Sequence, residues 1–188
     1  MDSLDHVTSQ ISRPRPRPRP RPRHGCKVVF GAGIFSLSLA AAAFEDRSSG
    51  LYFESGHAFR SESHADVVTL GAVVPWTPSS SFESGASSLY LDFFVSQWRA
   101  PLPSGSEHRS YTQAGAIANW RYRLDQGASP WFVEVGLGGT LMDSLYRTVD
   151  REFSTRFQFT EQFSVGRSFG SQGRHEVSIR FQHFSNAG

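Results

Sequence analysis

The sequence has 188 residues, enough for one domain with a sizeable core or for one closed barrel. Its formal charge is +2, but seven of the 19 basic residues and only two of the 17 acidic ones lie in residues 1–43. The rest of the chain therefore carries a net charge of −3, and the basic balance is no indication of nucleic-acid binding. Mean hydropathy is negative, which argues against a bundle of membrane-spanning helices.

Residues 1–43 have the composition of a leader. Arginine and proline alternate over 13–23, which excludes helix and sheet and predicts an extended, disordered segment. Lys27 and an apolar run over 28–43 follow, and the run ends in four alanines. This pattern predicts a secretory signal peptide with cleavage after Ala43. A membrane anchor is the alternative for the run, and an over-extended gene start or a nucleic-acid arm are alternatives for the arginine-proline repeat.

The single cysteine, Cys26, also lies in this leader. The rest of the chain therefore needs no disulfides and tolerates any redox compartment.

From residue 50 onward, apolar and polar side chains alternate with the period of two that β-strands have. The alternation predicts strands over 51–60, 65–74, 87–98, 113–124, 130–140 and 153–169, and a last strand over most of 175–188. The connections between them leave no room for crossover helices, so we predict an all-β, antiparallel up-and-down meander.

The polar rows of these strands indicate which face lies inside. They contain Arg121, Glu134 and Arg180 mixed with glycines, and the opposite rows are apolar through several consecutive strands. An outer-membrane β-barrel places such polar rows in a narrow lumen and the apolar rows against lipid. Four tryptophans near strand ends fit an interfacial girdle; they are Trp76, Trp98, Trp120 and Trp131. We predict a barrel in the outer membrane of a Gram-negative bacterium, with a soluble lipocalin-like barrel as the alternative.

The predicted barrel domain spans 44–188 and contains seven strands. An odd number leaves an open edge, whose unpaired backbone groups cannot face lipid. We therefore expect the chain to be truncated and to lack its last strand. If the amino terminus is periplasmic, the seventh strand ends at the outer leaflet, and the long loops at 99–112 and 141–152 lie outside.

The last predicted strand carries the residues with the most obvious chemistry. Val177, Ile179 and Phe181 form an apolar row that ends in His183 and Ser185 on the same face. A serine becomes a nucleophile only with a base in hydrogen-bond reach. The strand spaces this pair by roughly 6–7 Å, so a bent end or suitable rotamers must bring them together. From spacing alone, an incidental interfacial pair is the commoner explanation.

The residues around this pair resemble a known family. Residues 180–188, RFQHFSNAG, resemble the His-x-Ser-Asn-x-Gly motif of the outer-membrane lipid A 3-O-deacylases, the PagL family. Residues 131–138 resemble the family's fifth strand, and the strand around Phe159 resembles its sixth. The resemblance covers 130–188. It implies an eight-stranded barrel that hydrolyses the ester at position 3 of lipid A on its lipid-facing surface, without metal or cofactor.

The resemblance also implies roles for single residues. Ser185 is the expected nucleophile, and His183 is the general base that later protonates the leaving alkoxide. Asn186 is either an oxyanion-hole donor or a turn residue. Phe159 either lines the acyl groove or is ordinary lipid-facing bulk.

The family's catalytic glutamate follows the motif, in a segment that this sequence does not contain. Glu161 is the nearest substitute, because a hairpin that turns about Gln172 would pair residue 161 with His183. The alternative for Glu161 is a polar rim residue. We expect a chain without the last strand and its acid to be impaired as an enzyme.

The expected partners are lipid A, or lipopolysaccharide, as substrate and the outer membrane, with no nucleic acid; a homodimer is left open. Arg147, Arg151 and Arg156 are candidates for contacts with the lipid A phosphates, and ordinary loop charges are the alternative. The rival function is a non-catalytic outer-membrane barrel with a structural or adhesive role, in which the motif is incidental.

Overall fold

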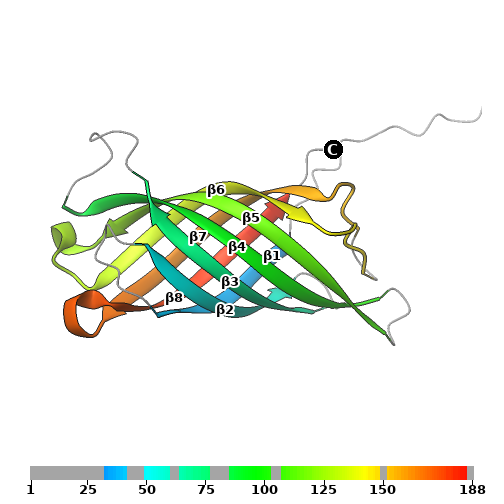
Figure 1. Cartoon of the computed structure of the whole chain (residues 1–188), viewed down its shortest axis with the longest axis horizontal. Coiled ribbons are helices and arrows are strands. Elements are labelled where there is room, and N and C mark those ends of the chain that lie inside the picture. The colour runs from blue at the N-terminus through cyan, green and yellow to red at the C-terminus, as the bar shows by residue number, and fades with distance from the viewer. Residues whose placement is uncertain are drawn as a thin grey trace, which may run out of the picture.

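The computed structural model describes residues 32–41, 49–59, 64–76, 85–102, 107–148 and 152–185. They form the strands β1 Ala32–Ala41, β2 Gly50–Phe59, β3 Ala65–Pro75, β4 Ser87–Pro101, β5 His108–Arg123, β6 Trp131–Met142, β7 Phe157–Phe169 and β8 His175–Ser185, and the 3-10 helices η2 Asp125–Gly127 and η3 Ser171–Gly173. Each strand pairs antiparallel with the next, and β8 pairs with β1, so the sheet is a closed barrel (Figure 1). Within these ranges, no helix is long and apolar enough to cross a membrane.

The seven predicted strands are present as β2 to β8, and the all-β, antiparallel up-and-down barrel is confirmed. β4 and β5 extend further than the alternation predicts, because their hairpin continues to the pair Pro101 and His108. β7 begins at Phe157 rather than at 153, because residues 152–156 belong to the preceding loop.

In the structure an eighth strand, β1, occupies the edge that the seven predicted strands leave open. β1 lies between β8 and β2, with Ala32 opposite Phe184 and Ala40 opposite Tyr52. This strand lies within the run predicted as a signal peptide, and the sheet of the structure includes residues from Ala32 onward. The domain boundary at residue 44 stays a prediction. The backbone N–H and C=O groups of β1 pair with the free edges of β2 and β8. A barrel wall in lipid requires such pairing, because unpaired backbone groups cannot face hydrocarbon. Cleavage after Ala43 and a further strand beyond Gly188 stay predictions.

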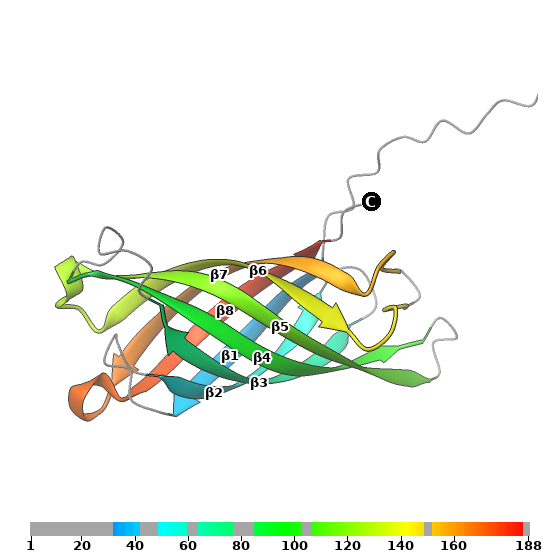
Figure 2. The same ribbon diagram turned by 45° about the horizontal axis from the view of Figure 1, so that its top comes forward.

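The two ends of the barrel differ (Figures 1 and 2). One end carries the tight turns at η2 and η3, and we call it the turn end. The other end carries the connection from β4 to β5, the long connection from β6 to β7, and the end of β8; we call it the loop end. The arginine-proline repeat at 13–23 lies outside the described residues.

Side chains alternate between the two faces of the wall. In β7 every second residue is exposed and its neighbours are buried. The outward rows are rich in large apolar side chains, among them Leu51, Phe53, Leu70, Phe93, Val95, Leu137, Phe163, Val165, Ile179 and Phe181. Exposure of such a continuous apolar surface to water is unfavourable, whereas contact with the hydrocarbon of a bilayer is favourable. The facing predicted from the sequence is therefore confirmed.

Three of the four tryptophans are exposed at the turn end, namely Trp76, Trp120 and Trp131. The Trp131 ring also lies against the Arg167 guanidinium, 5.6 Å from the ring centre. Trp98 departs from the predicted girdle, because its side chain points into the barrel and is fully buried. It belongs to the inward row of β4, the same row as Asp92.

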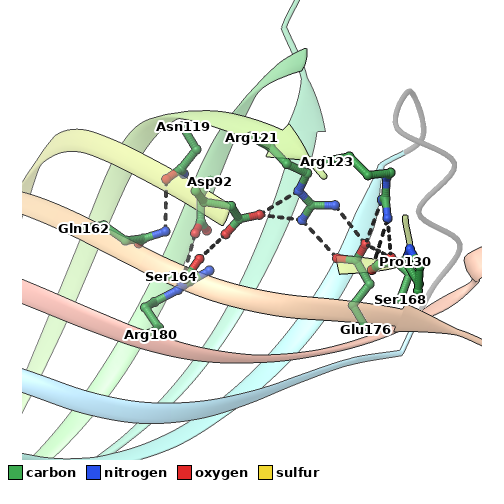
Figure 3. A network of polar contacts seen from close by, with 11 residues as sticks. Asp92, Asn119, Arg121, Arg123, Pro130, Gln162, Ser164, Ser168, Glu176 and Arg180 are labelled. Atoms are coloured by element: carbon green, nitrogen blue, oxygen red, sulfur yellow. Dashed lines mark hydrogen bonds and ion pairs between the residues drawn. The ribbon is translucent and has the colours of Figure 1, made fainter. Parts of the chain in front are cut away.

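Charged side chains fill the lumen towards the turn end (Figure 3). Arg121 donates to both oxygens of Glu176 at 2.8 and 2.9 Å and to Glu134 at 2.7 Å. Its guanidinium also lies 4.0 Å from the centre of the Phe132 ring. Buried charges are stable only when paired and hydrogen-bonded, and this arrangement meets that requirement.

A second buried arginine links the other half of the barrel to this network. Arg180 lies 3.2 Å from a carboxylate oxygen of Glu54 and 3.2 Å from one of Asp92. Tyr52 donates to Asp92 at 2.8 Å. Inward charges of both signs thus hold strands from opposite sides of the barrel together. The prediction that the polar rows face the lumen is confirmed.

Candidate active site

The predicted motif lies at the loop end of β8. His183 and Ser185 are partly exposed on the outer wall, in line with Ile179 and Phe181, which are 50% and 41% exposed. Phe184, between them, points into the barrel and is 0% exposed. The pair therefore faces the surface that lipid would cover, at the rim where the apolar wall ends.

The neighbouring strand β7 brings two further residues to this position. Glu161 is directly opposite His183, and Phe159 is directly opposite Ser185. All four side chains lie on the outer face. Directly opposite residues of an antiparallel pair have Cβ atoms about 4.5–5.5 Å apart, so a carboxylate on β7 can reach an imidazole on β8.

The turn between the two strands fixes this register. Gly170 and Gly173 flank it with φ values of 81° and 65°, a region that glycine adopts without strain. The turn contains residue 172, and Phe169 pairs with His175 directly beside it. The predicted pairing of residues 161 and 183 is confirmed.

The order of these groups has a chemical consequence. Glu161 neighbours His183 across the strand pair, and His183 neighbours Ser185 along β8. An acid beside an imidazole beside a hydroxyl is the order in which a carboxylate can orient a base that activates a serine. The arrangement can therefore support nucleophilic attack on an ester, on a surface otherwise made of aromatic and aliphatic side chains.

An open pocket of about 470 Å³ lies on the wall next to this group. It extends from Glu161 on β7 over β6 and β5 to β4, and its apolar lining includes Leu89, Ala118, Trp120, Val135 and Leu137. The side chain of Ala118 is smaller than those of its neighbours, so it leaves a depression in the outer surface of the wall. The pocket is apolar and opens on the lipid-facing side, so an alkyl chain suits it better than a polar ligand.

The predicted phosphate contacts differ in their surroundings. Arg156 lies just before β7, three residues before Phe159, and its Nε donates to the Met142 carbonyl at 2.8 Å. Arg147 forms an exposed ion pair with Glu152 at 2.6 Å. Arg151 lies outside the described residues, and so does Asn186. In the part of the chain that the structure describes, no group of three or more His, Cys, Asp or Glu could hold a metal ion.

Sequence reasoning missed Phe184, although a signal was present. The alternation of β8 places residue 184 in the inward row together with Arg180 and Gln182. A large aromatic residue in an otherwise polar row indicates an apolar compartment inside the barrel.

The family model for lipid A 3-O-deacylase (PagL) matches residues 66–188. The chain belongs to this family. The PagL match begins within β3 and includes the motif, Glu161 and Phe159. The chain is also similar to the lipid A deacylase PagL of Bordetella bronchiseptica, with 27% identity over 165 residues that cover 86% of this chain and 85% of that protein. No solved structure matches the chain significantly.

Proposed function

We propose that this protein is a lipid A 3-O-deacylase, a serine esterase that hydrolyses the 3-linked acyl ester of lipid A in the outer membrane of a Gram-negative bacterium. The observation that carries the proposal is the position of His183 and Ser185 on the lipid-facing wall, opposite Glu161 and Phe159, in a chain of the PagL family. An acyl ester of a membrane lipid lies near the headgroups, at the depth where this strand ends.

In the proposed mechanism, the Ser185 hydroxyl attacks the ester carbonyl while His183 accepts its proton. Asn186 donates a hydrogen bond to the oxyanion of the tetrahedral intermediate. The intermediate expels the sugar oxygen, which takes the proton from His183, and the acyl group stays on Ser185. Water, activated by His183, then releases the fatty acid. Glu161 orients His183 and stabilises its protonated form.

The wall around the motif supports a lipid substrate. Phe159 and Phe181 provide apolar surface beside the reacting ester, and the pocket next to Glu161 receives an acyl chain. Arg156 at the rim is better placed for a lipid A phosphate than Arg147, which is paired with Glu152, and Arg147 and Arg151 are further candidates. In the structure β1 closes the barrel and a carboxylate lies opposite His183, so we expect a chain that keeps residues 32–41 to be active.

The direct test is expression of the full chain in a Gram-negative host, followed by mass analysis of the extracted lipid A. We expect lipid A that has lost one 3-linked acyl chain. Unchanged lipid A in cells whose outer membrane holds the folded barrel would contradict the proposal and favour the structural or adhesive alternative. Recovery of the protein from the soluble periplasmic fraction would instead favour a soluble ligand-binding barrel.

Glu161→Gln is expected to lower kcat by about 10²- to 10⁴-fold, because a neutral amide neither orients His183 nor stabilises its charged form. Initial rates of purified, folded protein on lipid A give this value. Glu107→Gln is the matched control, since Glu107 is exposed at the loop end but lies on the connection between β4 and β5. Full activity in Glu161→Gln would show that another acid orients His183.

Ala118→Phe is expected to fill the pocket and to change the choice of acyl chain. Activity on long-chain esters should fall about tenfold or more, while activity on short-chain esters stays unchanged, because only a long chain reaches the pocket. Ala114→Phe is the control, since this residue faces outward on the same strand but does not line the pocket. An equal loss for both chain lengths would contradict this use of the pocket.

A further inference from the structure

Large apolar side chains, most of them aromatic, fill the loop end of the lumen, in contrast to the charged network towards the turn end. We call this group the mouth cluster; it consists of Trp98 on β4, Tyr111 on β5, Met142 on β6, Tyr146 and Phe153 from the connection between β6 and β7, and Phe184 on β8. All of them are buried. Four strands and the connection between β6 and β7 therefore contribute side chains that meet under the rim that carries the motif.

Ring contacts run through this cluster without a break. Trp98 meets Phe184 with ring centres 5.5 Å apart and planes at 74°, and meets Tyr146 at 5.6 Å and 72°. Tyr146 in turn lies 5.1 Å from the Phe153 ring. The two contacts of Trp98 are edge-to-face and therefore directional, so they fix orientation as well as distance. The position of Phe184 is thereby coupled to the loop that supplies Tyr146.

That loop is itself held to the barrel. The Tyr111 hydroxyl donates to the Arg147 carbonyl at 3.0 Å and accepts from the Arg147 amide at 3.2 Å. The Phe153 amide donates to the Tyr146 carbonyl at 3.0 Å, and Arg147 and Glu152 form an isolated bridge. The loop therefore presents Tyr146 to Trp98 from a fixed position.

Phe184 connects this cluster to the motif, because it lies between His183 and Ser185 and points to the opposite face of the same strand. Ser185 is the last residue of β8, and a strand end opens easily unless something holds it. A ring that is fully buried on the inner face restrains the backbone on both sides of it. The orientation of the two outer side chains depends on that backbone.

We infer that Phe184 is a positioning residue for His183 and Ser185, and that the mouth cluster, with the loop between β6 and β7, is the device that holds it. The inference rests on the proposed esterase function. It assigns a role in the reaction to residues that contact neither the substrate nor the reacting atoms. Loss of the anchor misplaces the nucleophile and its base without changing the surface that binds lipid.

The test compares Phe184→Leu and Tyr146→Ala with the wild-type protein. Each is expected to lower kcat per folded molecule by about 10- to 100-fold with KM within about twofold, because a misplacement near 1 Å is enough for such a loss. Tyr146→Phe keeps the ring and is expected to keep the activity. Phe132→Leu is the matched control, since Phe132 is equally buried in the lumen but lies at the turn end.

A purely structural role of the cluster would reduce the yield of folded protein and leave kcat per folded molecule unchanged. That result in Phe184→Leu and Tyr146→Ala, or an equal loss of kcat in Phe132→Leu, would overturn the inference. Amide hydrogen exchange at residues 183–185 provides a readout that needs no activity, and we expect it to be faster in both cluster variants only. Inactivity of the wild-type protein would overturn the proposed function, whereas unchanged exchange in the variants would overturn the positioning role.

Discussion

Ser185→Ala is expected to lower the rate of lipid A deacylation by about 10⁴-fold or more, while the barrel stays folded. The hydroxyl is the group that becomes acylated, and alanine offers no atom for that bond. His183→Ala should cost a similar factor, and the double variant little more, because residues that act as one unit in a mechanism are not additive. Rates of fatty-acid release by the purified, folded proteins give these values.

Ser171→Ala is the control for this series, since Ser171 is an exposed serine of the turn between β7 and β8, at the opposite end of the barrel. Its activity should equal that of the wild type. A Ser185→Ala protein that still releases the 3-linked acyl chain at a comparable rate would show that the nucleophile lies elsewhere.

The second large effect concerns stability. Arg121→Leu is expected to destabilise the barrel by about 3–5 kcal/mol, because it removes the paired cation of the buried Glu134 and leaves Glu176 with only the more distant Arg123, at 3.8 Å. Urea unfolding of the protein in detergent or vesicles measures this change as a lower transition midpoint. Activity per folded molecule should change little, since the network lies towards the other end of the lumen from the motif.

Arg167→Leu is the matched control for the stability experiment. Arg167 is also in the barrel wall, but its side chain is exposed and lies against the face of Trp131. Such a contact at an exposed site is worth about 0.5–1 kcal/mol, so the midpoint should shift only slightly. Equal midpoints for Arg121→Leu and the wild type would contradict the view that paired charges hold the strands together.

Much of the fold follows from the sequence because a barrel wall obeys a local rule. A period of two sorts each strand into an inner and an outer row, and charges such as Arg121 and Glu134 mark the inner one. The register of the last hairpin follows in the same way, since a tight turn about residue 172 leaves no choice but to set Glu161 against His183.

The first strand could not be predicted in this way. Residues 28–43 are apolar almost throughout, and a continuous apolar run is equally typical of a leader, a helix segment or a strand. Only the two free edges of β2 and β8 distinguish these possibilities, and those edges exist only once the other strands have assembled.

The mouth cluster was missed for a related reason. Trp98 is near a strand end, where an aromatic side chain commonly marks the membrane interface, yet its row points inward. Its partners include Tyr146 and Phe153, which come from a loop without a repeating pattern. The sequence predicted the motif and the register of its strand, but not the side chains that pack beneath it. The packing of a loop depends on contacts between distant segments, which no local pattern shows.

The most direct test of the account is to react the folded protein with a fluorophosphonate, which modifies activated serines covalently, and to map the modified peptide by mass spectrometry. We predict that the label is on Ser185 and that lipid A deacylation is lost in proportion to labelling. His183→Ala should prevent the labelling and should itself lack deacylation, because Ser185 is then not activated. Loss of deacylation with the label on another serine, or continued deacylation by protein fully labelled at Ser185, would contradict the account.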